Sequence, residues 1–362
     1  MRPVYYLSIF IPIAIGLNVA GASAPLIFFA SAIGVIPTAA LMSDATEQLA
    51  TRAGPGIGGL LNVTFGNAPE LIIAFFALEK GLQEVVKASL VGSVIGNSLL
   101  VLGASMLAGG IGRERQTFNR TAAHTQAGML LLATAALVLP AVFQLIHGGS
   151  LPNVSELRHD YGSEVETLSL AVAIILILSY VAGLFFSLKT HRDLFNEESD
   201  DDEDEVGAET WSIRRSVLML AIAGVLVGVM SEILVGSIEE ASHQIGLSQF
   251  FVGVFVVAIV GNAAEHYVAV VVARKNKMDL SVNIAIGSSA QIALFVAPVL
   301  VLLSFVVGPN PLALVFNGYE LAGLIAAVLI ANFLASEGES TWFEGVQLLA
   351  LYAVLGFVFA FA

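Results

Sequence analysis

Two glutamates lie inside long apolar stretches of this chain, and each belongs to the same short motif. One stretch contains Gly66-Asn67-Ala68-Pro69-Glu70 and the other contains Gly261-Asn262-Ala263-Ala264-Glu265. Residues three apart share a helix face, so each asparagine amide is expected beside its glutamate. Carboxylate and amide oxygens are the ligands that hard cations such as calcium prefer. The motifs therefore predict a cation site that contains Glu70, Glu265, Asn67 and Asn262.

The surroundings of the two glutamates favour this interpretation over a purely structural one. A single intramembrane glutamate can be a protonated residue that bonds neighbouring helices. Two of them at repeated positions, with no Lys or Arg inside the same stretches, favour a bound cation or protons. Gly66 and Gly261 should let the helices approach closely. Pro69 lacks a backbone donor and predicts a free carbonyl at Phe65 or Gly66.

A second pair of polar segments recurs with the same spacing. Gly92-Ser93 returns as Gly287-Ser288 at an offset of 195, which is also the offset from Gly66 to Gly261. Nearby polar residues extend each segment, and ordinary hydrogen bonding between helices is the alternative role for any one of them. Neither segment adds a further acid. The residues predicted to complete the site are Ser93, Asn97, Ser288 and Gln291, with Ser289 beside them.

Composition places these motifs in a membrane protein. Of 362 residues, 57% are hydrophobic and 12% are charged, whereas soluble domains carry about 25% charged residues. The absence of cysteine excludes thiol catalysis and thiolate metal sites. The net charge of −14 argues against a nucleic-acid partner. The sequence predicts an all-α polytopic protein whose outer surface contacts the lipid bilayer.

Eleven transmembrane helices are expected from the apolar runs. They lie at about 4–20, 24–42, 57–78, 89–110, 122–146, 167–188, 217–238, 249–273, 283–307, 312–334 and 343–361. The offset divides them into a separate first helix (1–22), repeat 1 with spans 2 to 6 (23–195), an acidic linker (196–210) and repeat 2 with spans 7 to 11 (211–362). Five crossings per repeat reverse the entry side, so the two five-helix repeats should have inverted topology. A cleaved signal peptide ending at Ala22-Ser23-Ala24 is the alternative for the first helix.

Basic residues orient the predicted helices. A cytoplasmic N-terminus places twelve of the fifteen Lys and Arg residues inside and leaves Lys80, Lys87 and Arg158 outside. The acidic run Glu197–Glu205 is then cytoplasmic; it is either a solvated charge run or a low-affinity calcium trap. Short loops favour a bacterial inner membrane, and a homo-oligomer is compatible with the pattern.

At these motifs the sequence resembles the calcium/cation antiporter superfamily, specifically its proton-coupled calcium exchanger branch. The closest part is Gly261-Asn262-Ala263-Ala264-Glu265-His266 with the segment from Gly287 to Val296. The resemblance implies that Glu70 and Glu265 bind calcium in one state and protons in the other. Gln291, in place of an acid, resembles the proton-coupled branch. The resemblance also implies a cytosolic vestibule made by Glu232, Glu239 and Glu240.

The expected activity is exchange of Ca²⁺ for H⁺, with calcium as a transported substrate and no cofactor. A carboxyl group removed from water favours its protonated form and a bound cation favours its ionised form, so the two ligands exclude each other. A Na⁺/Ca²⁺ exchanger and a divalent-cation channel remain alternatives. An intramembrane enzyme is disfavoured because no nucleophile accompanies the acids. His266 should point about 100° away from Glu265, which favours a helix-packing or regulatory role, and Glu320 should make a structural hydrogen bond.

Overall fold

The computed structural model describes residues 3–154, 161–190 and 211–362, without the side chains of residues 54–57, 59 and 63. Within these ranges nine helices are long and apolar enough to cross a membrane. A bent pair, Leu60–Gly66 with Ala68–Glu79, passes the same test when taken together, and Pro3–Val19 is a shorter apolar helix. The expectation of a helical, polytopic membrane protein is confirmed, whereas the count of eleven crossings stays a prediction.

The elements of the first half end before the acidic run. They are η1 (Pro3–Ile9), α1 (Phe10–Val19), α2 (Ala24–Gly66), α3 (Ala68–Glu79), α4 (Gln83–Ile95), η2 (Gly96–Val101), α5 (Leu102–Gly110), β1 (Gln116–Thr117), α6 (Arg120–Ile146), α7 (Ser163–Phe185) and η3 (Phe186–Thr190). The predicted linker, including Glu197–Glu205, lies outside the described residues.

The second half begins at Ile213. Its elements are α9 (Ile213–Ile245), α10 (Gln249–Phe251), η5 (Val252–Val257), α11 (Ala258–Arg274), α12 (Met278–Val282), η6 (Asn283–Gly287), α13 (Ser288–Gln291), η7 (Ile292–Val296), α14 (Ala297–Ser304), α15 (Gly318–Ala335), β2 (Glu339–Ser340) and α16 (Trp342–Ala360). The two-residue strands β1 and β2 pair antiparallel and join loops from the two halves.

Side-chain caps fix where several helices start. Asn119 accepts a hydrogen bond from Ala122 N at the start of α6, and Ser248 accepts one from Phe251 N at the start of α10. A complete capping box, with Asn317 and Glu320 bonded to each other's backbone N–H groups, begins α15. Such caps satisfy amide groups that the first helical turn leaves unpaired. The role expected of Glu320 as a structural hydrogen-bonding residue is therefore confirmed by these bonds.

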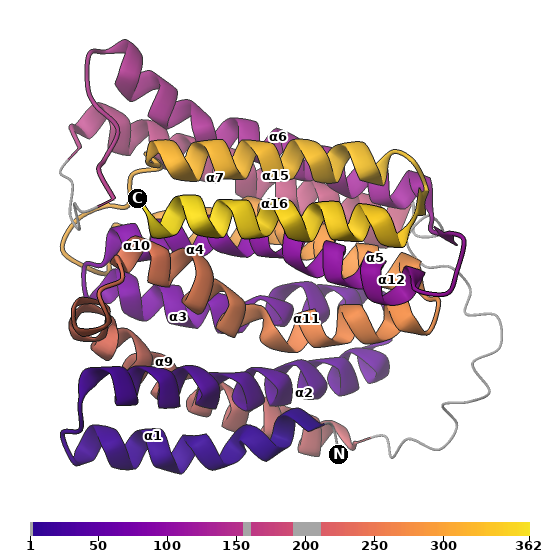
Figure 1. Ribbon diagram of the computed structural model, residues 1–362, viewed down its shortest axis with the longest axis horizontal. Helices are drawn as coiled ribbons and strands as arrows, with labels where there is room; N and C mark the ends of the chain where they lie inside the picture. Colours follow the sequence, from indigo (N-terminus) through magenta and orange to yellow (C-terminus); the bar gives the residue numbers. More distant parts are fainter. Residues whose placement is uncertain (1–2, 155–160, 191–210) are drawn as a thin grey trace.

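The helices form three layers (Figure 1). The most extensive helix packing joins α2 to α9, and α1 covers α2. The layer on the opposite side contains α6, α7, α15 and α16, and α3, α4 and α11 lie between these layers (Figure 1). The central layer therefore holds both motif glutamates away from the two outer surfaces.

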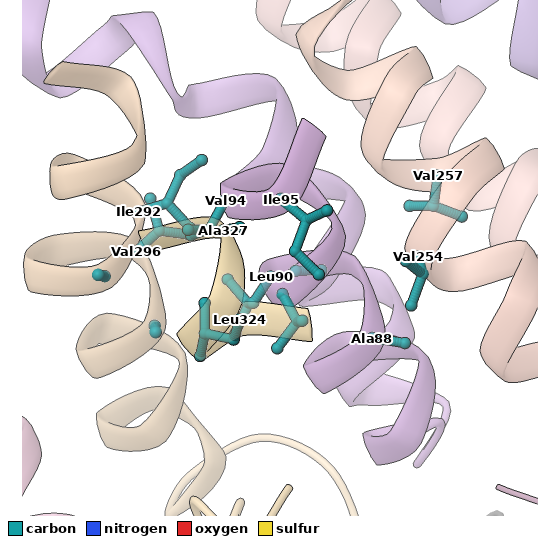
Figure 2. Close-up of a cluster of buried hydrophobic side chains, with 14 of the residues drawn as sticks. Ala88, Leu90, Val94, Ile95, Val254, Val257, Ile292, Val296, Leu324 and Ala327 are labelled. Atoms are coloured by element: carbon teal, nitrogen blue, oxygen red, sulfur yellow. The ribbon is translucent and has the colours of Figure 1, made fainter. Parts of the chain in front are cut away.

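Helix α4 is the centre of the buried core. Figure 2 shows it between Ile292 and Val296 on one side and Val254 and Val257 on the other. Gly92 is needed at this contact because a Cβ there would overlap the backbone of Val254. Close packing on both sides fixes the position of the α4 face that carries the polar residues.

Three features differ from the expected spans. Helix α2 continues from Ala24 to Gly66 through the polar segment 43–56, which was expected to separate spans 2 and 3, and the span expected at 57–78 is divided at Asn67 between α2 and α3. Helix α4 begins at Gln83 instead of residue 89, so Lys87 is a buried helical residue, 1% exposed, and not part of an outer loop. The tenth span starts at Gly318 instead of residue 312, because Pro311–Asn317 is not helical. Gln83, Glu84 and Lys87 interrupt the apolar pattern, so hydropathy excluded the first turns of α4. At residues 312–317 the chain is apolar, and hydropathy alone does not distinguish a helix from a non-helical chain there.

Candidate cation site

The first motif lies at a helix break. Helices α2 and α3 meet at Asn67 with a bend of 42°, and Pro69 occupies the first turn of α3. Proline suits this position because backbone N–H groups in the first turn of a helix have no acceptor within the helix, so the N–H that proline lacks is not needed. The Phe65 carbonyl accepts the N–H of Asn67, so it is not the free oxygen that Pro69 was expected to provide there. The expectation for Gly66 stays a prediction.

The second motif has no such break. Asn262 and Glu265 lie within the continuous helix α11, where Ala264 occupies the place that Pro69 has in the first motif. Asn262 therefore keeps a helical backbone, and its amide also donates to Ala258 O at 2.9 Å. The two halves thus present the same side-chain types on differently shaped backbones.

Each glutamate lies against the glycine of the other motif. The Glu70 Cγ is 3.3 Å from the point where a Cβ of Gly261 would stand, and Glu265 Oε1 is 3.4 Å from the same point at Gly66. The two carboxyl groups are also close enough to interact electrostatically. Glu70 is 9% exposed, whereas Glu265 is partly exposed. The glycines therefore allow two carboxylates from distant parts of the chain to share one site.

The amides and hydroxyls cross-link the halves reciprocally. Asn262 Nδ2 donates to Ser93 Oγ at 3.0 Å, and Ser288 Oγ donates to Asn67 Oδ1 at 3.0 Å. Asn67 Nδ2 also donates to Gln291 Oε1 at 2.5 Å. The offset of 195 residues relates the bond between Asn262 and Ser93 to the bond between Asn67 and Ser288. The structure thus brings both asparagines, both serines and Gln291 into one hydrogen-bonded group.

Three oxygens of this group have no partner among the described residues. They are Glu70 Oε2, Glu265 Oε2 and Asn262 Oδ1, and all three are inaccessible to solvent. Buried polar atoms are almost always satisfied, so each orphan requires an explanation. Protons on the carboxylates, or a cation held between the three oxygens, would satisfy them. No cluster of three or more His, Cys, Asp or Glu residues occurs in the described ranges, so neutral oxygens must complete any cation shell.

A small cavity adjoins Glu70. Its volume is about 10 Å³, and Ser89 and Ser93 supply polar groups to its wall. This volume is about that of one water molecule. Sequence reasoning missed Ser89, although its position four residues before Ser93 places both hydroxyls on one face of α4.

Asn97 and Ser289 make contacts different from those expected. Asn97 Oδ1 bonds with His266 Nε2 at 3.0 Å, and Ser289 Oγ lies 3.4 Å from Ser98 Oγ. His266 thus points away from Glu265, as expected from helix geometry, but it touches a residue of the predicted site. Through this bond Asn97 contacts helix α11 next to Glu265.

Two π-helical turns adjoin the site at corresponding positions. Gly96–Val101 forms η2, and η7 covers Ile292–Val296, close to the segment at which the 195-residue offset would place η2. A π turn widens the helix by one residue and redirects the side chains beside it, and such turns are frequent at functional sites. Here they begin within one turn of Ser93 and Gln291, which carry the site's hydrogen bonds.

The three carboxylates expected at a cytosolic mouth do not form one group. Glu232 and Glu240 line an open hollow of about 650 Å³, together with Lys80 and residues of the α1–α2 turn. Glu239 is exposed and does not line it. The chain's N-terminus lies at the other end of α1 from this turn (Figure 1). A cytoplasmic N-terminus would therefore place the hollow on the opposite side of the membrane, so the predicted orientation and the predicted cytosolic vestibule are incompatible with each other.

The chain is similar along its length to known transporters. Residues 23–189 and 215–361 match the family model described as sodium/calcium exchanger protein. A Ca²⁺/H⁺ antiporter of Aphanothece halophytica is 44% identical over 347 residues, which are 92% of this chain and 90% of that protein. The Ca²⁺/H⁺ antiporter ChaA of Bacillus subtilis (strain 168) is 44% identical over 334 residues, 92% and 91% of the two chains.

The fold is also similar to that of a solved structure. The structure of native YfkE matches with a TM-score of 0.83 at 38% identity, and the match covers 99% of this chain and 100% of that one. Both the sequence and the arrangement of helices therefore agree with one family over nearly the whole chain. The chain belongs to the sodium/calcium exchanger protein family.

Proposed function

We propose that this protein exchanges Ca²⁺ for H⁺ across a membrane, with Glu70 and Glu265 binding either ligand. The observation that carries the proposal is the pair of buried carboxylates, one from each half, whose Oε2 atoms have no partner among the described residues. The names of the two antiporters support the choice of ligands. The cation is the substrate, and no resident cofactor or catalytic group is part of the proposal.

Charge balance explains why the two ligands would alternate. Two ionised carboxylates carry two negative charges, which one Ca²⁺ or two protons neutralise. In a low-dielectric site the unneutralised pair is strongly disfavoured, so release of one ligand favours binding of the other. Asn67, Asn262, Ser93, Ser288 and Gln291 would complete the oxygen shell, because calcium takes about six to eight oxygens.

Gln291 supports proton coupling over sodium coupling. Its Oε1 accepts the hydrogen bond from Asn67, and its amide brings no negative charge. An exchanger that holds several sodium ions would need more carboxylate charge than Glu70 and Glu265 provide. The two negative charges of Glu70 and Glu265 are the number that two protons neutralise.

Alternating access would use two inverted five-helix repeats after a separate first helix. The recurrence of site residues at one offset supports this layout, as does the packing of α2 against α9, which contain corresponding residues of the two halves. The reciprocal Asn–Ser bonds lie where the halves meet. The hollow beside Glu232 and Glu240 would collect cations at one end of the path, and a bacterial inner membrane would be the location.

Transport in proteoliposomes tests the proposal. Calcium added outside vesicles loaded with acid buffer should enter, and protons should leave only when calcium is present. A sodium gradient at equal pH on both sides should drive no uptake. The proposal would be contradicted by proton flow without calcium or by calcium uptake driven by sodium. Calcium flux without proton counterflow would also contradict it and would indicate a channel.

A further inference from the structure

An extended segment is buried where a membrane helix was expected. Pro311–Asn317 has no helical structure, and Leu312 to Asn317 are at most 2% exposed. Leu312, Leu314 and Phe316 belong to the main core, whereas Ala313 and Val315 pack in a second cluster with Tyr161. This alternation is that of a β-strand with both faces covered.

Side chains from three helices supply hydrogen bonds to this backbone. Leu312 N donates to Ser304 Oγ at 2.7 Å, and Leu314 N donates to Ser169 Oγ at 2.9 Å. Gln83 Nε2 donates to the carbonyls of Asn310 and Pro311. Non-helical backbone is tolerated at membrane depth only when the protein satisfies its polar groups. The segment is therefore held by a dedicated set of residues.

Lys87 binds this backbone through its charged group. Its Nζ donates to Val315 O at 2.7 Å and pairs with Glu84 Oε1 at 2.5 Å, while the Tyr161 ring lies 5.7 Å away. Glu320, which is 0% exposed, faces the same two charges. A buried lysine needs such partners, and its position shows that the carbonyl of the extended segment is one of them.

This group of residues lies between the cation site and one end of the molecule. The connection before the segment contacts the end of α3, since a Cβ on Gly308 would meet Leu78 O. We call this the Lys80 end, because Lys80 caps α3 there. Leu90, less than one helical turn after Lys87, lines the cavity beside Glu70 and belongs to the cluster that includes Leu324 (Figure 2).

We propose that Lys87 is a positioning residue that fastens Pro311–Asn317 as a seal between the Glu70 cavity and the compartment at the Lys80 end. The seal would confine ions and water to the route controlled by the glutamates. Without the seal, protons would leak across the protein, and proton flow would no longer be coupled to the calcium exchange proposed above. The role of the seal itself requires only that the protein spans a membrane.

The chain has no cysteine, so one introduced thiol reports the seal directly. Ser89→Cys places a near-isosteric thiol in the cavity wall, and Lys80→Cys in a separate variant marks the Lys80 end. A membrane-impermeant maleimide applied to that side should label the Lys80→Cys protein quickly and the Ser89→Cys protein slowly. Adding Lys87→Met with Glu84→Gln, which keeps the net charge of the cluster, should raise the Ser89→Cys labelling rate about tenfold or more, the factor expected from losing a charge-assisted hydrogen bond.

Three further measurements separate a seal from general damage. Lys87→Arg, which keeps the charge and donors, should restore slow labelling. Lys275→Met, which removes an exposed lysine outside this cluster, should leave it slow. Calcium-free proteoliposomes with the double variant should leak protons. If the double variant remains monodisperse with unchanged labelling and no leak, or if Lys275→Met accelerates labelling equally, the proposal is wrong. Failure of calcium exchange in the unmodified protein would overturn the proposed function but leave the labelling result interpretable.

Discussion

Asn262 donates a hydrogen bond to Ser93 at 3.0 Å, and the corresponding bond joins Ser288 to Asn67 at the same distance. The four residues come from helices far apart in the sequence, yet each asparagine is held by the serine of the opposite half. This reciprocal pairing orients both amides at the interface where the carboxylates meet. It predicts that equivalent changes in the two halves will have similar effects.

The serines test that equivalence. Ser93→Ala and Ser288→Ala should each raise the calcium concentration for half-maximal uptake by about two- to tenfold, because each removes one net hydrogen bond at the site. Ser179→Ala, at an exposed position of α7, serves as the control. Uptake kinetics in proteoliposomes measure the change. A large effect from one serine and none from the other would contradict the reciprocal arrangement.

The carboxylates should be indispensable. Glu70→Gln and Glu265→Gln each keep the shape of the side chain but remove one of two charges available to the cation. Proton-driven ⁴⁵Ca uptake should fall by at least about a hundredfold, because losing one partner of a buried charge interaction costs about 3–5 kcal/mol. Glu79→Gln, exposed at the end of α3, should transport normally. Wild-type uptake in either site variant, with folding intact, would remove that glutamate from the site.

Calcium affinity should depend steeply on pH. Protonated carboxyl groups do not bind calcium, so lowering the pH reduces the fraction of the site that is available. At pH values low enough that the calcium-free glutamates are protonated, each pH unit of acidification should raise the half-saturating calcium concentration about a hundredfold if two protons are displaced, and about tenfold if one is. Calorimetry at several pH values gives this slope. A pH-independent affinity across the range of transport would contradict direct competition.

A methyl group at Gly261 should weaken the site. Its Cβ would lie 3.3 Å from Glu70 Cγ, so the carboxylate must move. Gly261→Ala should raise the half-saturating calcium concentration about tenfold, which corresponds to ~1.4 kcal/mol of overpacking. Gly128→Ala on α6, where nothing lies within 4 Å of the added methyl, is the matched control. Equal effects of both substitutions would show that general helix properties, and not the contact with Glu70, are responsible.

The sequence was most informative where the two halves repeat. Glu70, Glu265, Asn67 and Asn262 could be found because the same motif recurs inside two apolar stretches. The serines followed from the same offset. The structure adds their partners across the interface, which spacing within one half does not contain.

The contacts that sequence reasoning missed are those between the halves. The bond from His266 to Asn97 crosses 169 positions, so no local periodicity could indicate it. Leu312 to Phe316 were assigned to a helix because hydropathy treats a buried extended segment and a helix alike. One local signal was present: Asn317 followed three residues later by Glu320 has the spacing of a capping box, which places the helix start after the apolar run.

The break at Asn67 has a consequence for the energetics of the whole molecule. Two identical halves of opposite orientation would give conformations open to either compartment with equal energy. Pro69 interrupts one motif helix while α11 remains continuous through the corresponding position. In the proposed alternating-access cycle the two conformations are therefore not equivalent by symmetry, and the resting protein would favour one compartment even with no ion gradient across the membrane.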